Sequence, residues 1–133
     1  MVMLDTNICI YVLKNHPQKL RHKFNATPNL AISSVVYAEL CYGIENSDSP
    51  KKQQRWEQLA LFIQGLDIIA WDKTAAQHYG EIRVELKRLG TPIGNNDLLI
   101  AAHARSLNVT LVTNNVREFN RVSDLAIENW LED

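Results

Sequence analysis

The sequence predicts an α/β fold in which a central parallel sheet is flanked by helices on both faces. Short apolar runs alternate along the chain with longer stretches of helical pattern, and this order is typical of a parallel sheet. Runs this short and apolar are typical of strands that are buried on both faces. The predicted strands lie at residues 2–4, 30–32, 68–70 and 109–112, with a weaker run around 125–127.

Four helices are predicted between these strands. Ser33 or Ser34 can cap the first and Pro50 can begin the second, because serine caps helix N-termini and proline is tolerated in the first turn. Gly90 can end the third helix, and Asn95 or Asn96 can cap the fourth. The predicted helices run to about Glu45, from residue 50 to 65, from 73 to 89 and from 98 to 107.

The chain has 133 residues, of which 46% are hydrophobic, so it can bury a core within one domain. No apolar run approaches the roughly 20 residues that cross a bilayer, and the first residues lack the basic segment of a signal peptide. We therefore expect a cytoplasmic protein that does not bind membranes. The net charge of -1 argues against a protein that holds nucleic acid by charge alone. Basic residues still cluster locally, as at Arg83, Lys87 and Arg88, although such a cluster can also be a solvated helix face.

Polar residues follow two of the predicted strands directly. Asp5 comes after the first strand, and Thr113, Asn114 and Asn115 come after the strand at 109–112. Functional sites of open α/β sheets lie at the carboxyl ends of the strands. These two points can therefore be neighbours in the sheet although they lie more than a hundred residues apart in sequence.

Two further acids fall on apolar helix faces. Glu39 lies three residues after Val36 and four before Gly43, on the small and apolar face of its helix. Asp97 lies in the first turn of the helix at 98–107 and heads a stripe of small apolar residues. A carboxylate on a core-facing stripe is costly unless it is paired, hydrogen-bonded or bound to a metal.

Each of the three acids could also have a purely structural role. Asp5 could be a helix N-cap, Asp97 an ordinary first-turn acid, and Glu39 one half of an ion pair with an arginine. Taken together, the three acids fall where the fold would gather them at one edge of the sheet. Clustered carboxylates repel each other, and a hard divalent cation relieves that repulsion. Ligands that are all oxygen favour Mg²⁺ or Mn²⁺ over zinc.

The sequence resembles the PIN-domain ribonucleases, and specifically the VapC toxins of bacterial toxin–antitoxin pairs. Each matching motif is weak alone, but four of them occur in the right order and together span essentially the whole chain. They are Met3-Leu4-Asp5-Thr6-Asn7; Ile32-Ser33-Ser34 with Ala38-Glu39-Leu40 and Gly43; Ile93-Gly94-Asn95-Asn96-Asp97 with Ile100-Ala101-Ala102-His103-Ala104; and Leu111-Val112-Thr113-Asn114-Asn115 with Glu118-Phe119.

The resemblance implies a PIN-like three-layer fold, with residues 1–133 forming a single PIN domain. It implies Mg²⁺-dependent cleavage of RNA, with Mn²⁺ as a substitute, by attack of water that leaves a 3′-hydroxyl and a 5′-phosphate. The RNA could be initiator tRNA, cut in the anticodon region to inhibit translation. The implied partners are a VapB-like antitoxin, which inhibits the enzyme and through which the complex binds operator DNA, and a second copy of the chain.

Carried over by motif, Asp5, Glu39 and Asp97 take the catalytic and metal-binding positions. The residues implied to support them are Thr6 or Asn7, Ser34, Thr113 and Asn115. Many PIN domains have a fourth acid where this chain has Asn115, which puts a second tightly held metal in question. Glu118 could contribute instead.

Two rival functions fit part of the pattern. A phosphatase would have a second acid in Asp5-Thr6-Asn7 and a lysine after a late strand, and this chain has neither. A catalytically idle PIN-like module that binds nucleic acid or regulates would not need to retain the three acids.

Overall fold

The computed structural model describes residues 1–15 and 17–131, which form a five-stranded parallel sheet covered by helices. The strands are β1 (Val2–Leu4), β2 (Leu30–Ser33), β3 (Asp67–Ile69), β4 (Thr110–Val112) and β5 (Ile127–Glu128). Their order in the sheet is β3-β2-β1-β4-β5. The predicted α/β fold with a central parallel sheet is confirmed.

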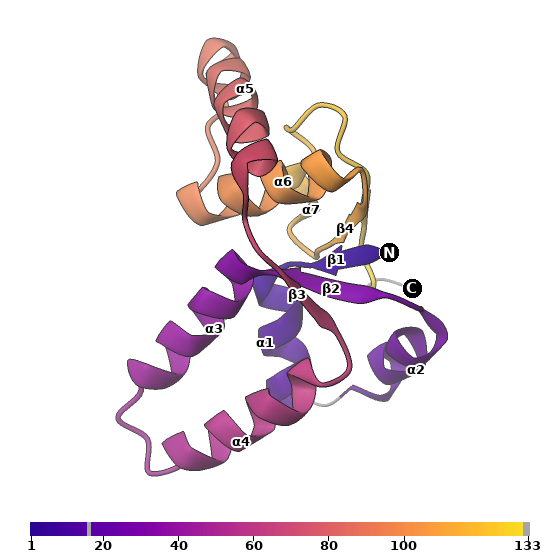
Figure 1. The fold of residues 1–133 in the computed structure, drawn as a ribbon, viewed down its shortest axis with the longest axis vertical. Coiled ribbons are helices and arrows are strands. Elements are labelled where there is room, and N and C mark those ends of the chain that lie inside the picture. Colours follow the sequence, from indigo (N-terminus) through magenta and orange to yellow (C-terminus); the bar gives the residue numbers. More distant parts are fainter. Residues whose placement is uncertain (16, 132–133) are drawn as a thin grey trace.

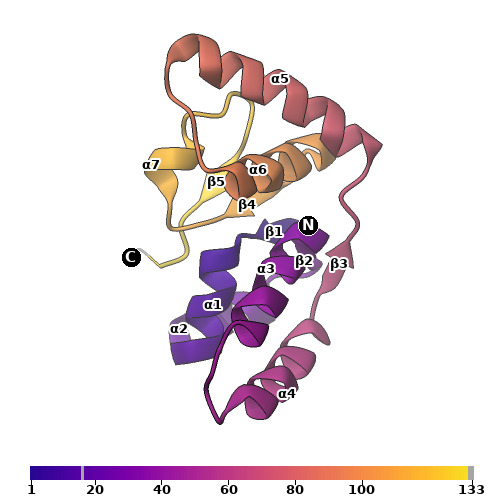
Figure 2. The same ribbon diagram turned by 90° about the vertical axis from the view of Figure 1, so that its left-hand side faces the viewer.

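The helices divide between the two faces of the sheet (Figures 1 and 2). One face is covered by α1 (Thr6–Asn15), α2 (Gln18–Ala26), α3 (Ser34–Glu45) and α4 (Lys52–Ile63). The other is covered by α5 (Lys73–Leu89), α6 (Asn95–Leu107) and α7 (Val116–Phe119). Within the described residues, no helix combines the length and the apolar character needed to cross a lipid bilayer.

The core lies between the sheet and these two helix layers. In the central strands, Met3, Leu4, Ile32 and Leu111 are fully buried, which the apolar runs predicted. The prediction of burial on both faces is wrong for β3, where Asp67 and Ile68 are exposed. β3 is an edge strand, so only one side of it pairs with a neighbour and less of it is covered.

Two predicted helix starts need correction. α4 begins at Lys52 rather than Pro50, because the Ser49 hydroxyl accepts from the backbone N–H of Lys51 and holds a turn before the helix. α6 is capped by Gly94 rather than Asn95 or Asn96. The Asn95 and Asn96 amides bond instead to other elements, Asn95 to Tyr79 and Asn96 to Glu39.

Other helix boundaries agree with the sequence. The Ser33 hydroxyl accepts from the N–H of Val35 and caps α3, and α5 covers the predicted 73–89. Gly90 follows α5 with a φ of 69°, the left-handed conformation that glycine adopts without strain. Three helices were not among the four predicted: α1, α2 and the four-residue α7. For α1, only the possible role of Asp5 as a helix N-cap pointed to it.

Candidate active site

Asp5 lies where β1 ends and α1 begins, next to the end of β4. In the parallel pairing of these strands, Leu4 lies opposite Val112, so Asp5 and Thr113 come next to each other. The Asp5 side chain is only 2% exposed, and both of its oxygens accept hydrogen bonds. Oδ1 accepts from the N–H of Ile8 at 2.9 Å, and Oδ2 accepts from the Thr113 hydroxyl at 2.5 Å. Asp5 therefore caps α1 with one oxygen while it stands at the edge of the sheet where the other acids gather.

Burial of Asp5 raises its pKa above the usual value. The hydrogen bonds from Thr113 and Ile8 act in the opposite direction, and the nearby charge of Glu39 adds to the increase. The carboxylate is thus held in a site where its negative charge is costly. A cation at this position would offset that cost.

Glu39 projects from α3 and is held by neutral donors from two other helices. Oε1 accepts from the Thr6 hydroxyl of α1 at 2.6 Å, and Oε2 accepts from the Asn96 amide of α6 at 3.1 Å. These contacts account for an acid on an apolar helix face. Among the described residues they take the place of the arginine ion pair that was the alternative. They also bring α1, α3 and α6 together at this edge of the sheet.

Asp97 lies in the first turn of α6 and has the most strongly perturbed carboxyl group of the site. Its pKa is raised to about 7, first by burial and then by the charges of Glu118, Asp5 and Glu39. Because the charges of these other acids act on Asp97, the four acids form one electrostatic group. At neutral pH a substantial fraction of Asp97 therefore keeps its proton.

Glu118 is the acid that the sequence indicated least clearly. It projects from α7, and its carboxylate accepts from the N–H of Gly94 at 2.7 Å and from the Asn115 amide at 2.6 Å. Burial alone would raise its pKa, but these hydrogen bonds, another from Asp97 and the charge of Arg121 together lower it. The available sequence signal was its position three residues after Asn115, within reach across one helical turn.

The supporting residues predicted from the motifs have different surroundings. Thr113 is fully buried, and its oxygen also accepts from the N–H of Asn115 at 2.9 Å, which connects Asp5 to the Asn115–Glu118 pair. Ser34 is engaged elsewhere, because its hydroxyl accepts from the N–H of Trp71 at 3.0 Å. Asn7 is exposed in the first turn of α1. The geometry thus favours Thr6 over Asn7 as the supporting residue from α1.

Comparison with known proteins agrees with this arrangement. Residues 2–125 match the PIN domain family. The chain is 47% identical to ribonuclease VapC2 of Rickettsia felis, with 96% of each chain covered. It is 46% identical to the tRNA(fMet)-specific endonuclease VapC of Shigella flexneri, again with 96% of each covered.

The chain belongs to the VapC ribonucleases of the PIN-domain family. A crystal structure of VapBC2 from Rickettsia felis, bound to a DNA fragment from its promoter, is similar to this VapC ribonuclease with a TM-score of 0.93. The identity is 46%, and the match covers 98% of this chain and 99% of that one. The expected family and three-layer PIN fold are therefore confirmed.

PIN-domain ribonucleases of the VapC type are generally dependent on divalent metal ions, and the donor set here fits such an ion. The four carboxyl groups supply oxygen donors, and their mutual repulsion favours a cation between them. In the described part of the chain, no three of the His, Cys, Asp or Glu side chains are already close enough to form a ligand set on their own. Mg²⁺ usually keeps several of its water ligands in proteins and binds through one or two carboxylates.

Proposed function

We propose that this chain is the toxin of a toxin–antitoxin pair, an Mg²⁺-dependent endoribonuclease that cuts initiator tRNA in its anticodon region and so inhibits translation. The observation that carries the proposal is the group of four acids at the carboxyl ends of β1 and β4. The name of the Shigella flexneri relative, at 46% identity, supports the choice of tRNA. The enzyme would act in the cytoplasm, where tRNA and the translation machinery are found.

Asp5 and Asp97 would hold the ion, with Glu118 as a third acid and Glu39 facing them. When bound, Mg²⁺ polarises the scissile phosphate and stabilises the charge that develops on it. Asn115 would act through Glu118, because its amide holds Glu118 Oε2 at 2.6 Å. We assign one ion to the site, since Asn115 replaces the fourth acid of many PIN domains.

Glu39 would orient the attacking water and accept its proton. Its carboxylate is fixed by Thr6 and Asn96, so its direction does not depend on the ion. Asp5 is likewise fixed by Ile8 and Thr113 before anything binds. In-line attack by water would leave a 3′-hydroxyl and a 5′-phosphate, and the 2′-hydroxyl would take no part.

A groove beside Glu39 would take the antitoxin. It has a volume of about 460 Å³ and lies between α1, α3 and α4, with Leu13, Leu40 and Ile44 among its lining residues. Lys14 and Arg55 also line it, so an amphipathic antitoxin segment with acidic residues would complement it. A basic residue of that segment could then enter the acidic site and displace the ion. By analogy with the VapBC2 complex, the antitoxin would bind operator DNA. The complex on the DNA would contain two copies of this chain.

Substitutions that each remove one carboxyl charge test whether the acids are needed for RNA cleavage. Asp5→Asn and Asp97→Asn should each lower the rate of RNA cleavage in Mg²⁺ by about 100-fold or more, and EDTA should abolish wild-type cleavage. Glu57→Gln, an exposed acid of α4, is the matched control and should cleave normally. Undiminished cleavage by either site variant would contradict the proposal.

The idle-module alternative is tested by metal binding alone. Calorimetric titration of the wild-type chain with Mn²⁺ should show one site, and Asp97→Asn should weaken it. If the wild type takes up no Mn²⁺, the chain is an idle binding module.

The antitoxin part is tested separately, with the two proteins co-expressed and purified as a complex. The complex should cleave RNA much more slowly than the free chain. A complex with full nuclease activity would show that no partner residue blocks the acidic site.

A further inference from the structure

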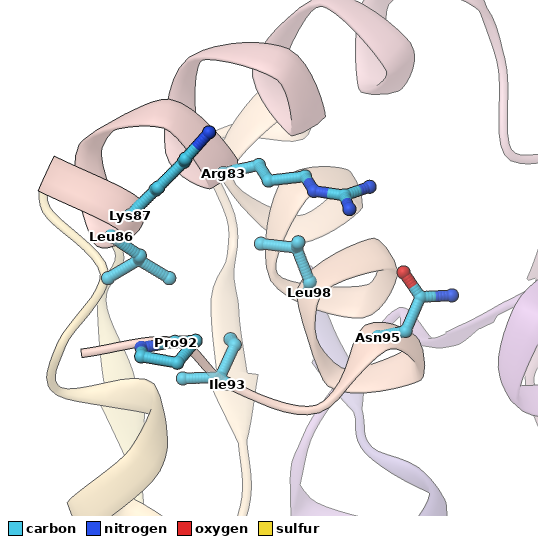
Figure 3. Close-up of a pocket in the computed structure, with 7 residues that line it drawn as sticks. All are labelled: Arg83, Leu86, Lys87, Pro92, Ile93, Asn95 and Leu98. Atoms are coloured by element: carbon cyan, nitrogen blue, oxygen red, sulfur yellow. The ribbon is translucent and has the colours of Figure 1, made fainter. Parts of the chain in front are cut away.

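A second cavity lies next to the acidic site, between α5, the start of α6 and the loop that joins them (Figure 3). Its volume is about 380 Å³, which accommodates a small ligand. Leu86, Pro92, Ile93 and Leu98 give it an apolar lining, and Leu86 and Leu98 are almost completely buried. The cavity is therefore a preformed apolar pocket on the opposite side of the sheet from the groove at α1, α3 and α4.

One short stretch of chain separates this cavity from the acidic site. Ile93 and Asn95 line the cavity, whereas the N–H of Gly94 between them donates to Glu118 at 2.7 Å. The next residues, Asn96 and Asp97, face the acids, with the Asn96 amide on Glu39. If the phosphate to be cleaved in a nucleic-acid strand lies among the acids, the neighbouring nucleotide of that strand lies at this cavity.

The charges at the cavity have the sign opposite to those of the acidic site. Arg83 and Lys87 come from successive turns of α5, are both exposed, and extend from one side of the cavity in Figure 3. None of the described residues that line the cavity is acidic. An apolar floor with cations at its rim fits a nucleotide, which has an apolar base face and an anionic phosphate.

Arg83 is also held in place. Its Nη1 donates to the Tyr79 hydroxyl at 2.7 Å, its guanidinium lies 5.8 Å from the centre of the Tyr79 ring, and that hydroxyl donates to Asn95 Oδ1 at 3.2 Å. Pro92, part of the apolar lining, is held as well, because Arg121 donates a hydrogen bond to its carbonyl oxygen at 3.0 Å. A held guanidinium loses less side-chain entropy on binding an anion than a free one would.

We propose that this cavity binds the RNA nucleotide adjoining the cleaved bond, with its base on Pro92, Ile93 and Leu98 and its phosphate at Arg83 and Lys87. The inference rests on the proposed ribonuclease function and adds a binding site to it. Because these residues hold a nucleotide that does not react, their contribution is to substrate binding. It should appear in KM and not in kcat.

The test is RNA cleavage and binding by Arg83→Ala/Lys87→Ala, measured on a fluorescent RNA hairpin with the anticodon stem-loop sequence of initiator tRNA. We expect KM to rise about 10-fold with kcat changed by less than about 2-fold. RNA binding is measured with Ca²⁺ in place of Mg²⁺. The slope of the logarithm of the binding constant against the logarithm of the salt concentration should become shallower by about 0.7 for each phosphate contact removed. Arg88→Ala is the matched control, because Arg88 is an exposed cation of the same helix outside this cavity and should change neither quantity.

An RNA with an abasic nucleotide beside the cleaved bond tests the position of the base. It should bind the wild type more weakly. The same change should matter less in the double variant, since the base contacts and the phosphate contacts hold the same nucleotide and are therefore coupled. The proposal is overturned if the double variant keeps the wild-type KM and salt slope. It is also overturned if the variant loses only its affinity for the antitoxin, which would make the cavity a protein-binding site. If the wild type itself cleaves no RNA, the failure lies in the proposed function instead.

Discussion

Asp97 and Glu118 form a carboxyl pair in which the interaction between them raises the pKa of Asp97 and lowers that of Glu118, so below about pH 7 the pair holds one proton. Asp97 comes from α6 and Glu118 from α7, and Gly94 and Asn115 donate to Glu118 from either side. Because those donors favour a charged Glu118, the proton resides on Asp97. This arrangement determines how the site should respond to pH and to metal.

Metal binding should release the shared proton. With the pKa of Asp97 at about 7, Mn²⁺ binding should release about one proton at pH 6 and almost none at pH 8, and affinity should weaken below pH 7. Calorimetry in buffers of different ionisation enthalpy measures this number. Equal proton release at the two pH values would show that Asp97 does not carry the proton.

Neutralising Asp97 should stabilise the metal-free protein although it lowers the rate of cleavage. An acid whose pKa is raised on folding adds stability at low pH and loses it as pH rises from about 4 to about 7, so at pH 8 its charge is a net cost. Asp97→Asn should then raise the melting temperature in EDTA at pH 8 by about 3–5 °C, near 1 kcal/mol after allowance for solvent screening.

Asp48→Asn, at an exposed acid before α4, is the control and should leave the melting temperature unchanged. At pH 4 the difference between Asp97→Asn and the wild type should largely disappear, because the wild-type carboxyl is then neutral in the folded chain and only about half ionised in the unfolded chain. A lower melting temperature for Asp97→Asn at pH 8 would contradict this account.

Loss of the Thr113 hydroxyl should destabilise the fold through Asp5. Thr113→Val keeps the side-chain shape but leaves Asp5 Oδ2 and the N–H of Asn115 without their partner in a buried place. We expect the free energy of unfolding to fall by about 1.5–3 kcal/mol, as for hydrogen bonds to charged groups. Urea denaturation measures it, and Thr113→Ser, which keeps the hydroxyl, should lose much less; equal losses would place the effect in packing.

Restoring an acid at position 115 should make the site depend more on metal. Asn115→Asp replaces the amide that donates to Glu118 at 2.6 Å with a second carboxylate, so the metal-free protein should lose about 1 kcal/mol of stability. Mn²⁺ should recover that loss. Asn114→Asp, at the exposed neighbouring residue, is the control, and melting curves with Mn²⁺ and with EDTA compare the two. A loss that Mn²⁺ does not recover would count against a metal between these acids.

Much of the fold was predictable because burial leaves a local pattern. The apolar runs at β1, β2 and β4 and the helix from Lys73 to Leu89 agree with the structure to within one residue. α2 was missed because it buries Leu20 alone, which leaves no apolar stripe to detect. The four residues of α7 are too few for any period. That residues 1–133 form one domain stays a prediction.

For the site, the sequence by itself determined which acids to consider, because Asp5, Glu39 and Asp97 are each costly or conspicuous in their local pattern. Tertiary structure alone decided how they act. Thr113 reaches Asp5 across 108 residues, Asn96 reaches Glu39 across 57, and Glu118 enters the group through Gly94 and Asn115. The physical reason is that burial follows the periodicity of one helix or strand, whereas the partner of a polar atom depends on which elements the sheet order brings together.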